Sequence, residues 1–326
     1  YLVLETSSHA LDQYRIWGVQ YKTAVITNVT REHLDYHRSM DEYRIAKYKL
    51  FCCAQIAIVN LDMEKPRDYL LYKIPEKYGF TTKEVDCSSY DCGNMLAVKA
   101  KNIHIDNGGS EFEVEGVRYK LNLPGQFNAE NALAAICVGK SEKINPEIMA
   151  QALEKIKVVS GRMDRVENDK DIDVIIDYAL TPDSLEKLYS LIHEKMGAEL
   201  SDGSSTPKII AVFGSCGDRD RGKRPLMGEI VDKYADYIIL TNEDPYTEDP
   251  QKVIDEIAAG IKNKKERENF WRILDRREAI KKALQIAKPK DIILVTGKGA
   301  EETMMIGKKM IPWNDRRVIE EELRKL

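Results

Sequence analysis

Short apolar runs that alternate with helix-like stretches constrain the fold of this chain more than any other feature of its sequence. Near the start, the runs 1–5 (YLVLE), 24–29 (AVITNV) and 55–60 (QIAIVN) are joined by connections that include the helical pattern 41–51. Strand, crossover and strand in this order predict a parallel sheet. We interpret residues 1–5 as a buried strand of that sheet.

The pattern changes twice further along the chain. Residues 96–105 (LAVKAKNIHI) and 112–123 (FEVEGVRYKLNL) alternate in polarity around the turn residues 106–109, which predicts antiparallel strands. A second strand-and-helix pattern begins near residue 160, with strands expected at 172–179, 208–214, 235–242 and 290–297. We therefore predict two α/β domains, 1–158 and 159–326, and the 326 residues suffice for both.

Composition excludes several classes of function. A hydrophobic fraction of 43% and a charged fraction of 32% fit a globular protein without apolar runs of membrane-spanning length. The net charge of −4 gives no attraction to nucleic acid or to an anionic membrane. The cysteines include no CxxC pair, and Cys87 and Cys92 lack a second pair of ligands, so we expect free thiols in a reducing cytoplasm.

Two polar segments stand where predicted strands end. Residues 5–12 (ETSSHALD) follow the first strand and residues 27–37 (TNVTREHLDYH) follow the second. Open α/β sheets bind ligands at the carboxyl ends of their strands, so we expect the two segments to converge. Their hard oxygen atoms suit Mg²⁺. The alternative is that these residues only cap helices and line loops.

A third segment is rich in positive charge. Residues 214–227 (GSCGDRDRGKRPLM) follow a strand and open a helix, which places backbone donors and cationic side chains at a positive helix end. This arrangement suits phosphate and carboxylate groups, which arginine can hold with two hydrogen bonds. The alternative is a solvated charged loop.

These three segments closely resemble the Mur ligase family, in its MurE-type branch of UDP-N-acetylmuramoyl-dipeptide:amino acid ligases. The resemblance implies a central ATPase-type domain (1–158) and a Rossmann-like, amino-acid-binding C-terminal domain (159–326). It implies ATP-dependent addition of the third amino acid to UDP-N-acetylmuramoyl-L-Ala-D-Glu through an acyl phosphate, in peptidoglycan precursor synthesis. A cytoplasmic monomer without nucleic-acid or membrane partners is expected.

The resemblance also implies a metal site. Glu5 and His33 match the positions that hold Mg²⁺ beside the nucleotide phosphates. Lys47 matches a carbamylated lysine, whose carboxylate-like group holds a second Mg²⁺; Lys49 is the competing assignment, and the spacing favours Lys47. A lysine reacts with CO₂ only when its pKa is lowered. His9 is expected to be structural.

Nucleotide contacts are implied at three positions. Asn128, in the segment LPGQFNAENALAA, matches an asparagine beside the adenine, whereas Asn131 is expected to cap or pack a helix. Arg162 matches an arginine that contacts ATP, and Asp177 matches an aspartate that binds the ribose. Leu180 replaces a family histidine, which removes one polar group near the nucleotide.

Substrate contacts are implied at two groups of residues. Ser7 and Arg15 match positions that touch the uridine-nucleotide peptide. Further residues are expected to bind the substrates from the C-terminal domain: Arg219, Lys223, Arg224, Asp244, Tyr246, Gly297 and Glu301. Of these, Gly297 and Glu301 match the positions that hold the α-amino and α-carboxyl end of the incoming amino acid, within a GKGHE-like motif in which Ala300 replaces the histidine.

The choice of amino acid is expected to depend on residues 243–246 (EDPY). Family members that add meso-diaminopimelate usually carry Asp-Asn-Pro-Arg there, and the arginine binds the distal carboxylate. Tyr246 replaces that arginine, and two acids favour a cationic side chain. The hypothesis is therefore lysine, or another diamino acid such as ornithine, rather than diaminopimelate.

The chain has no GxxxxGK[ST] phosphate loop. Family members carry that loop just upstream of the segment that matches residue 1, so we interpret the sequence as truncated at its N-terminus and expect the fragment alone to be inactive. Two alternatives stay open. One is another Mur-type ligase, similar to cyanophycin synthetase or folylpolyglutamate synthetase. The other is a degenerate, non-catalytic protein that binds nucleotides or peptides.

Overall fold

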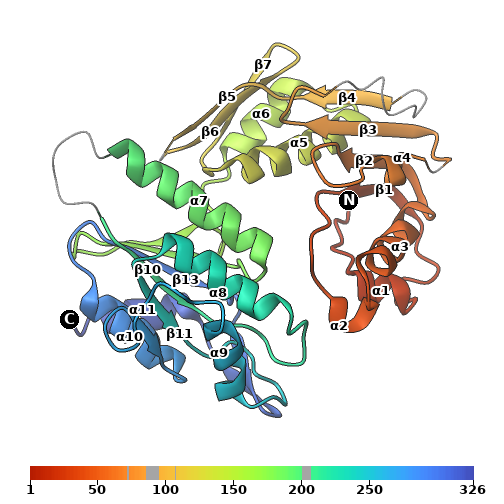
Figure 1. Ribbon diagram of the computed structural model, residues 1–326. Helices are drawn as coiled ribbons and strands as arrows, with labels where there is room; N and C mark the ends of the chain where they lie inside the picture. Colours follow the sequence, from red (N-terminus) through yellow and green to blue (C-terminus); the bar gives the residue numbers. More distant parts are fainter. Residues whose placement is uncertain (72, 86–94, 107, 200–206) are drawn as a thin grey trace. The chain divides into compact units, whose positions relative to one another are not determined.

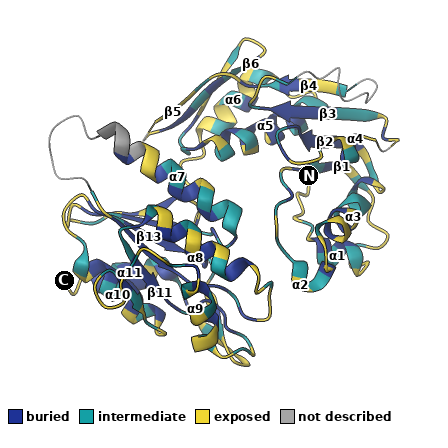
Figure 2. Cartoon of the chain, in the orientation of Figure 1, coloured by how far each residue is buried: buried dark blue, intermediate teal, exposed yellow. Residues whose placement is uncertain are grey.

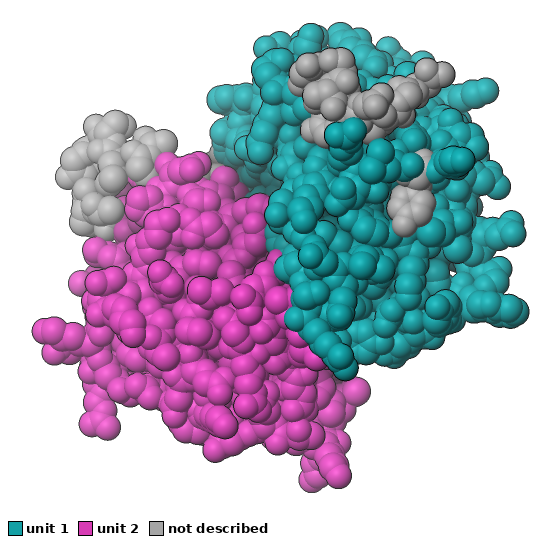
Figure 3. Space-filling view, turned by 45° about the vertical axis from the view of Figure 1, so that its right-hand side comes forward, with its two compact units in different colours: residues 1–30, 36–157 teal, residues 31–35, 158–326 magenta. Residues whose placement is uncertain are grey.

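A computed structural model of the protein describes residues 1–71, 73–85, 95–106, 108–199 and 207–326 (Figure 1). The chain forms two compact units, one of residues 1–30 and 36–157, the other of residues 31–35 and 158–326 (Figure 3). The second unit thus includes a short segment that the predicted boundary assigns to the first. Cys87 and Cys92 lie outside the described residues.

The first unit is built on a parallel sheet, as the sequence predicts. Its four strands lie in the order of the chain: β1 (Tyr21–Ile26), β2 (Ala54–Asn60), β3 (Glu76–Thr81) and β4 (Met95–Lys99). All three neighbouring pairs are parallel. Short helices α1 (Ser8–Asp12), α2 (Leu34–His37) and α4 (Arg67–Leu70) accompany the crossover helix α3 (Met40–Phe51). The helix predicted at 41–51 is therefore confirmed.

The prediction of a buried strand at residues 1–5 is wrong. The segment forms no strand, and Tyr1, Leu2 and Val3 are exposed. An apolar run becomes a strand only where a neighbouring strand takes up its backbone hydrogen bonds and one of its faces is covered. Among the described strands, none pairs with residues 1–5, and β1 pairs only with β2.

The antiparallel region is confirmed with one correction. Strands β5 (Lys101–Asp106), β6 (Gly109–Val114) and β7 (Val117–Leu121) form a three-stranded antiparallel sheet. The expected strand 96–105, however, divides at the buried Ala100, whose amide donates to the Thr81 oxygen at 3.0 Å. Because that bond continues the pairing of β4 with β3, the first half of the predicted strand joins the parallel sheet instead.

Helix α5 (Gln126–Ser141) covers this sheet because its inward residues are small or aliphatic. Ala129, Leu133 and Ile136 pack with Ile58 and Phe80 in one buried cluster. Helix α6 (Pro146–Glu154) follows, with Asn145 as its N-cap. Burial of each large aliphatic or aromatic side chain stabilises such a cluster by about 1.5–3 kcal/mol.

The second unit contains a six-stranded sheet. Its order is β12 (Phe270–Arg272), β11 (Tyr237–Leu240), β10 (Ile209–Phe213), β13 (Ile292–Thr296), β9 (Asp173–Asp177) and β8 (Asp164–Val166). Only the β8–β9 pairing in this sheet is antiparallel. The helices are α7 (Pro182–Glu199), α8 (Lys223–Tyr234), α9 (Pro250–Ala258), α10 (Arg276–Ile286) and α11 (Asp315–Leu323). A hairpin of β14 (Thr303–Ile306) and β15 (Lys309–Pro312) precedes α11.

Both units are α/β structures, and the strands β2, β3, β10, β11 and β13 are largely buried (Figure 2). The central strands β10, β11 and β13 are continuous apolar runs, as expected for strands covered on both faces. The predicted α/β architecture is confirmed. In the second unit, the motifs assigned from sequence follow β9, β10, β11 and β13, which are adjacent in the sheet.

A buried ion pair ties two of these strand ends to the last helix. Arg276, the first residue of α10, and Asp315, the first residue of α11, are both fully buried. The guanidinium donates to the two carboxylate oxygens of Asp315 at 2.8 and 2.6 Å. It also donates to the backbone oxygens of Thr296, at 2.9 Å, and Asn242, at 3.4 Å. The chain segments after β11 and β13 are thereby held at a fixed distance.

We expect Arg276→Met to lower the free energy of unfolding by about 3–5 kcal/mol, because it leaves the Asp315 carboxylate buried without its cation. Urea denaturation followed by circular dichroism measures this. The neighbouring Arg277 provides a control, since its side chain is 35% exposed and its buried partner Glu322 keeps a second cation, Lys325. Arg277→Met should cost less than about 1 kcal/mol. Equal losses for the two variants would contradict the role given to the buried pair.

Candidate active site

Two cations of the glycine-containing segment after β10, at the start of α8, lie inside the fold. The guanidinium of Arg224 is fully buried. It donates to the carboxylates of Glu248 and Glu256, at 2.8 and 2.6 Å, and to the backbone oxygen of Cys216 at 3.1 Å. These hydrogen bonds lower the pKa of Glu248 to about 2. In this structure the donors of Arg224 hold the protein's own loop in shape, and its assignment to the substrate stays a prediction.

Lys223, the first residue of α8, is buried as well. Its ammonium is buried and donates to the backbone oxygen of Leu180 at 2.9 Å. Leu180, which replaces a family histidine, is therefore the residue whose backbone oxygen Lys223 binds. Lys223 thus joins two chain segments in this structure, and its assignment to the substrate stays a prediction.

Arg219 is exposed and lies over the ring of Tyr246, with 5.8 Å between the guanidinium carbon and the ring centroid. Arg221 is exposed too, but it is paired with Glu248 at 2.9 Å. The loop therefore presents Arg219 to solvent beside a residue of the segment after β11. Two residues predicted to bind substrate, Arg219 and Tyr246, are brought together.

The segments after β11 and β13 are joined by a buried lysine. The Lys298 ammonium donates to Asp244 at 2.8 Å and also to Glu301. The other oxygen of Glu301 accepts a hydrogen bond from Tyr178, at 2.9 Å. Although burial opposes its charge, the hydrogen bonds to the two carboxylates raise the pKa of Lys298. Two predicted substrate residues, Asp244 and Glu301, thus share one cation that the sequence did not single out.

Glu243 lies beneath this cluster. It is fully buried, and the Cys216 thiol donates to one carboxylate oxygen at 3.3 Å. The other oxygen lies against Gly297, where a Cβ would come within 1.8 Å of it, and Gly297 has a φ of 103°. Only glycine tolerates both conditions. Burial raises the pKa of Glu243, so its charged form is disfavoured.

The two acids at 243–244 are therefore not free charges. Glu243 is enclosed, and the carboxylate of Asp244 accepts hydrogen bonds from Lys298 and from the amide of Met305, the latter at 2.7 Å. The sequence argument that these acids attract a cationic side chain does not hold in the structure. What remains of that argument is the replacement of an arginine by Tyr246.

The predicted nucleotide residues of this unit adjoin the same cluster. Asp177 ends β9 and accepts hydrogen bonds from the amides of Met163 and Ala179, both at 2.8 Å. Burial raises the pKa of Asp177. Arg162 is exposed and lies over the ring of Tyr178, 4.8 Å from its centroid. Arg162 contacts the Tyr178 ring and Asp177 precedes Tyr178 in the chain, so both adjoin the Tyr178–Glu301 hydrogen bond.

In the first unit the two polar segments predicted to converge do so. His37 is hydrogen-bonded to Ser8 at 2.9 Å, and Tyr36 donates to Asp12 at 2.9 Å. His9 packs against the Tyr36 ring, with centroids 4.4 Å apart, in agreement with a structural role.

The two residues predicted to bind the uridine-nucleotide peptide flank this contact. Ser7 is the N-cap of α1, and its hydroxyl accepts from the amide of Ala10 at 3.1 Å. Arg15 is exposed on the loop after α1. Both assignments stay predictions.

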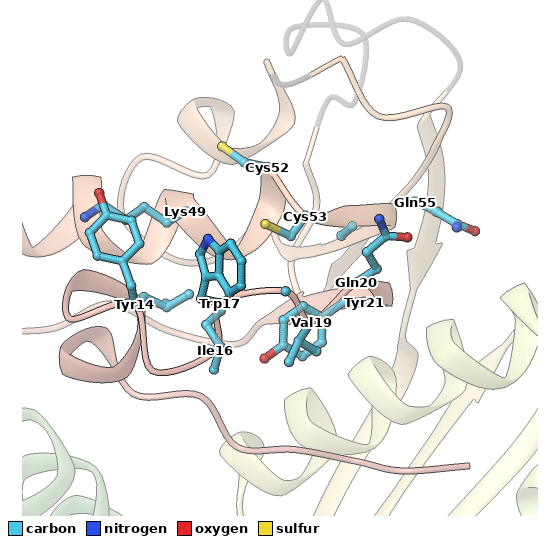
Figure 4. A pocket seen from close by; sticks show the side chains of 13 residues that line it. Tyr14, Ile16, Trp17, Val19, Gln20, Tyr21, Lys49, Cys52, Cys53 and Gln55 are labelled. Carbon is cyan, nitrogen blue, oxygen red and sulfur yellow. The ribbon is translucent and has the colours of Figure 1, made fainter.

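A cavity of about 690 Å³ lies beside this loop (Figure 4). Trp17 and Val19 line it from the loop, and Cys53 and Gln55 line it from the segment that enters β2. Lys49 also lines the cavity. None of the predicted substrate residues lines it, although Arg15 lies between two lining residues, Tyr14 and Ile16.

The comparisons with known proteins match both units. Residues 1–139 match the Mur ligase middle domain, and residues 161–299 match the glutamate ligase domain of Mur ligases. Together the two matches span most of the chain, in the predicted order. The chain belongs to the Mur ligase family.

Relatives place it in the MurE-type branch. The chain is 37% identical over 331 residues to the UDP-N-acetylmuramoyl-L-alanyl-D-glutamate–2,6-diaminopimelate ligase of Syntrophomonas wolfei, covering 99% of this chain and 64% of that protein. It is 38% identical to the ligase of the same name from Clostridioides difficile, covering 100% of this chain and 65% of the relative. A solved structure of such a ligase is 28% identical, with a TM-score of 0.55, over 98% of this chain and 63% of that one.

This Mur ligase chain therefore spans slightly less than two thirds of the relatives that it matches. The family uses ATP and Mg²⁺. In the described part of this chain, no helix combines the length and the apolar character needed to cross a membrane.

The predicted metal ligands of this Mur ligase chain are distributed over both units. Glu5 is exposed in the segment before α1, and Lys47 lies on α3 with its ammonium 5.1 Å from the centroid of the Tyr43 ring. His33 groups with the second unit, and its ring lies 3.6 Å from the Glu32 carboxylate. Among the described residues, no group of three or more His, Cys, Asp or Glu side chains is arranged to hold a metal. The metal site stays a prediction.

Lys49 is a poor candidate for carbamylation. Its ammonium is paired with Asp12 at 2.7 Å and lies 5.0 Å from the centroid of the Tyr14 ring. The hydrogen bond to Asp12 raises the pKa of Lys49, which keeps the amine protonated. Since only the neutral amine reacts with CO₂, the pairing with Asp12 counts against Lys49.

The sequence missed a polar network between β2 and α5. Asn128 donates to the backbone oxygen of Pro124 at 2.9 Å, within its own turn. Nearby, Asn60 at the end of β2 donates to the backbone oxygen of Thr27 at 2.8 Å and to Glu130 at 3.4 Å. The sequence signal that could have indicated this network is the asparagine at the end of the β2 run, Asn60. It links the end of β1 to the helix that carries Asn128.

Thiol reactivity tests the burial of the Glu243 site. Burial and the Glu243 carboxylate raise the pKa of Cys216, and burial raises the pKa of Cys137 to about 12. The thiolate is the reactive form. At about pH 8 we expect iodoacetamide to label the exposed Cys52 and Cys53 at least ~10-fold faster than Cys216 or Cys137, as measured by peptide mass spectrometry. All four should react alike in urea. Native labelling of Cys216 as fast as that of Cys52 would contradict the arrangement.

Proposed function

We propose that this chain is the middle and C-terminal part of a ligase that adds a diamino acid to UDP-N-acetylmuramoyl-L-Ala-D-Glu. ATP converts the terminal carboxylate of the nucleotide peptide to an acyl phosphate, and the amino group of the incoming amino acid displaces phosphate. The observation that carries the proposal is that charged residues gather at adjoining strand ends of the second unit. Arg162, Arg219 and the partly exposed Glu301 lie there, around the buried pair of Lys298 and Asp244. The identity to MurE-type ligases supports it.

The incoming amino acid is assigned to the segment after β13. Glu301 would accept the ammonium of the amino acid, and the backbone of Gly297 would contact its other end. Arg219 would hold a carboxylate or phosphate group, because it is the exposed arginine of its loop that stands beside Tyr246. Such fixed charges stabilise the developing charge on the reacting groups.

The nucleotide is assigned to three residues. Arg162 would contact the phosphates of ATP, Asp177 the ribose and Asn128 the adenine. Asp177 still has acceptor capacity, because each of its oxygens accepts one amide hydrogen bond and a carboxylate oxygen can accept two. Ser7 and Arg15 would contact the nucleotide peptide.

Glu5, His33 and a carbamylated Lys47 would hold Mg²⁺. Oxygen donors of this kind suit the ion. Lys47 is preferred because it stands at the position that matches the family's carbamylated lysine, and the pairing of Lys49 with Asp12 counts against the competing assignment. The metal would offset the charge of the transferring phosphoryl group. The protein is expected to act as a monomer in the cytoplasm, with the nucleotide peptide and the diamino acid as its partners.

For the third amino acid we propose lysine or ornithine. The support is Tyr246, which stands where diaminopimelate-adding members of the family carry an arginine for the distal carboxylate. The relatives named above are diaminopimelate ligases, and that amino acid is the competing candidate.

The decisive experiment measures phosphate release by the protein expressed from its complete gene, with ATP, Mg²⁺ and UDP-N-acetylmuramoyl-dipeptide. Lysine, ornithine and diaminopimelate are added in turn and then in competition. Release that depends on one of them supports the ligase and identifies the amino acid. If folded protein binds the nucleotide peptide but releases phosphate with none of them, the non-catalytic alternative is favoured.

Tyr246→Arg tests the basis of the amino-acid choice. A new arginine can form a bidentate ion pair with a distal carboxylate, and hydrogen bonds to charged groups contribute about 1.5–3 kcal/mol. The ratio of kcat/KM for diaminopimelate to that for lysine should therefore rise about 10- to 100-fold. Tyr246→Phe is the control, since it keeps the ring beneath Arg219, and it should leave the ratio within about twofold. An unchanged ratio in the arginine variant would show that another part of the site selects the amino acid.

A further inference from the structure

The carboxylate of Glu301 is held at both of its oxygens. Tyr178 donates to one oxygen at 2.9 Å, and the ammonium of Lys298 donates to the other. The Glu301 side chain is 39% exposed, whereas that of Lys298 is 1% exposed. A carboxylate that a ligand can reach is thus fixed from behind by two donors.

Lys298 is anchored on its far side. Its ammonium also donates to Asp244 at 2.8 Å, and the second oxygen of Asp244 accepts from the amide of Met305 at 2.7 Å. A buried ammonium is stable only when carboxylates and hydrogen bonds compensate its lost hydration. Asp244 supplies that compensation inside the fold. The lysine can therefore direct a fixed positive charge toward Glu301.

Tyr178 is fixed by the loops around it. Arg162 lies over its ring, and Gly299 packs so closely that a Cβ there would lie 2.9 Å from the Tyr178 Cβ. Gly161 approaches Ala300 in the same way: its φ is 70°, and a Cβ on Gly161 would lie only 2.1 Å from the Ala300 amide nitrogen. The hydroxyl of Tyr178 consequently points at Glu301 from a ring that cannot shift freely.

These contacts fix the position of the Glu301 carboxylate. Glu301 is the partly exposed member of this group, and Asp244 already compensates the charge of Lys298 inside the fold. Two donors nevertheless converge on the Glu301 carboxylate, one of them a buried lysine. Burial and the Glu301 carboxylate raise the pKa of Tyr178, so its hydroxyl remains a donor at physiological pH.

We propose that Tyr178 and Lys298 are positioning residues that orient Glu301 for the amino group of the incoming amino acid. This inference rests on the proposed function. It adds that the aromatic ring beneath Arg162 and the buried lysine fix the geometry of the amino-acid site before the amino acid binds. A preorganised carboxylate spares the ordering that binding would otherwise require.

The first test is Tyr178→Phe in the protein expressed from its complete gene. The variant keeps the ring beneath Arg162 and removes only the hydroxyl that bonds Glu301. We expect the KM for the amino acid to rise about 10-fold, which matches the loss of one hydrogen bond to a charged group. The KM for ATP and the Tm should stay near the wild-type values. Tyr237→Phe is the matched control, because Tyr237 stacks on Trp271 at the start of β11, and it should change neither KM.

The second test separates positioning from stability at Lys298. Lys298→Met should lower the Tm, because Asp244 is left as a buried charge, and should raise the KM for the amino acid at least ~10-fold. Adding Asp244→Asn removes the unpaired charge and should restore much of the Tm. The KM should remain raised, because Glu301 still lacks its lysine. Lys264→Met, which breaks another mostly buried lysine–aspartate pair with Asp232, should lower the Tm without changing the KM.

The outcomes distinguish this inference from the function on which it rests. If the wild-type protein turns over the amino acid and both Tyr178→Phe and the Asp244→Asn/Lys298→Met variant keep its KM, the positioning role is wrong and the ligase assignment stands. A double variant that recovers both Tm and KM would show that Lys298 is merely structural. If the wild-type protein shows no amino-acid-dependent turnover, the proposed function is overturned and this inference with it.

Discussion

The buried ion pair of Arg276 and Asp315 is the constraint on which the rest of the second unit depends. One guanidinium donates to a carboxylate on the last helix and to the backbone oxygens of Asn242 and Thr296. The next residues after these two begin the segments that carry Glu243 and Gly297. Since neither charge can leave its partner without being buried alone, the two segments cannot separate while the fold is intact. A candidate site formed by separate loops thereby acquires the rigidity of the sheet core.

Burial divides the charged residues around the site into two groups with different tasks. Arg224, Lys223 and Lys298 are enclosed, and each bonds a carboxylate or backbone oxygen of the protein itself. Arg162 and Arg219 are exposed, and each lies over a tyrosine ring. Stacking on a ring limits the motion of an arginine without using its hydrogen-bond donors. The exposed pair therefore keeps donors for a ligand, whereas the enclosed cations give rigidity to the loops.

Sequence patterns predicted the part of the structure that depends on local periodicity. The helical pattern of α3 and the apolar runs at β2, β9, β10, β11 and β13 gave the correct elements. The strand predictions failed where pairing with another part of the chain determines whether a run of residues becomes a strand. Residues 1–5 have the composition of a strand but pair with none of the described strands, and the run 96–105 divides because the amide of Ala100 bonds Thr81. The same reason limits what the sequence could predict about the site. A lysine or arginine in a glycine-containing loop has the same local signature whether it faces a ligand or a buried carboxylate, so Lys223 and Arg224 could not be told from Arg219. Their partners, Leu180 and Glu248, lie elsewhere in the chain.

The segment 297–299 (GKG) illustrates how packing, not composition, gives a short motif its meaning. Gly297 adopts a left-handed conformation and leaves the space of a side chain to the carboxylate of Glu243. Lys298 was overlooked in the sequence because its importance depends on Asp244, which is 54 residues away. It points inward to Asp244 and Glu301, where a phosphate-binding lysine would have to point outward. Gly299 packs against Tyr178, the residue that completes the hold on Glu301. Each of the three residues is thus explained by a buried neighbour, and together they direct one carboxylate toward the position where the amino acid is proposed to bind.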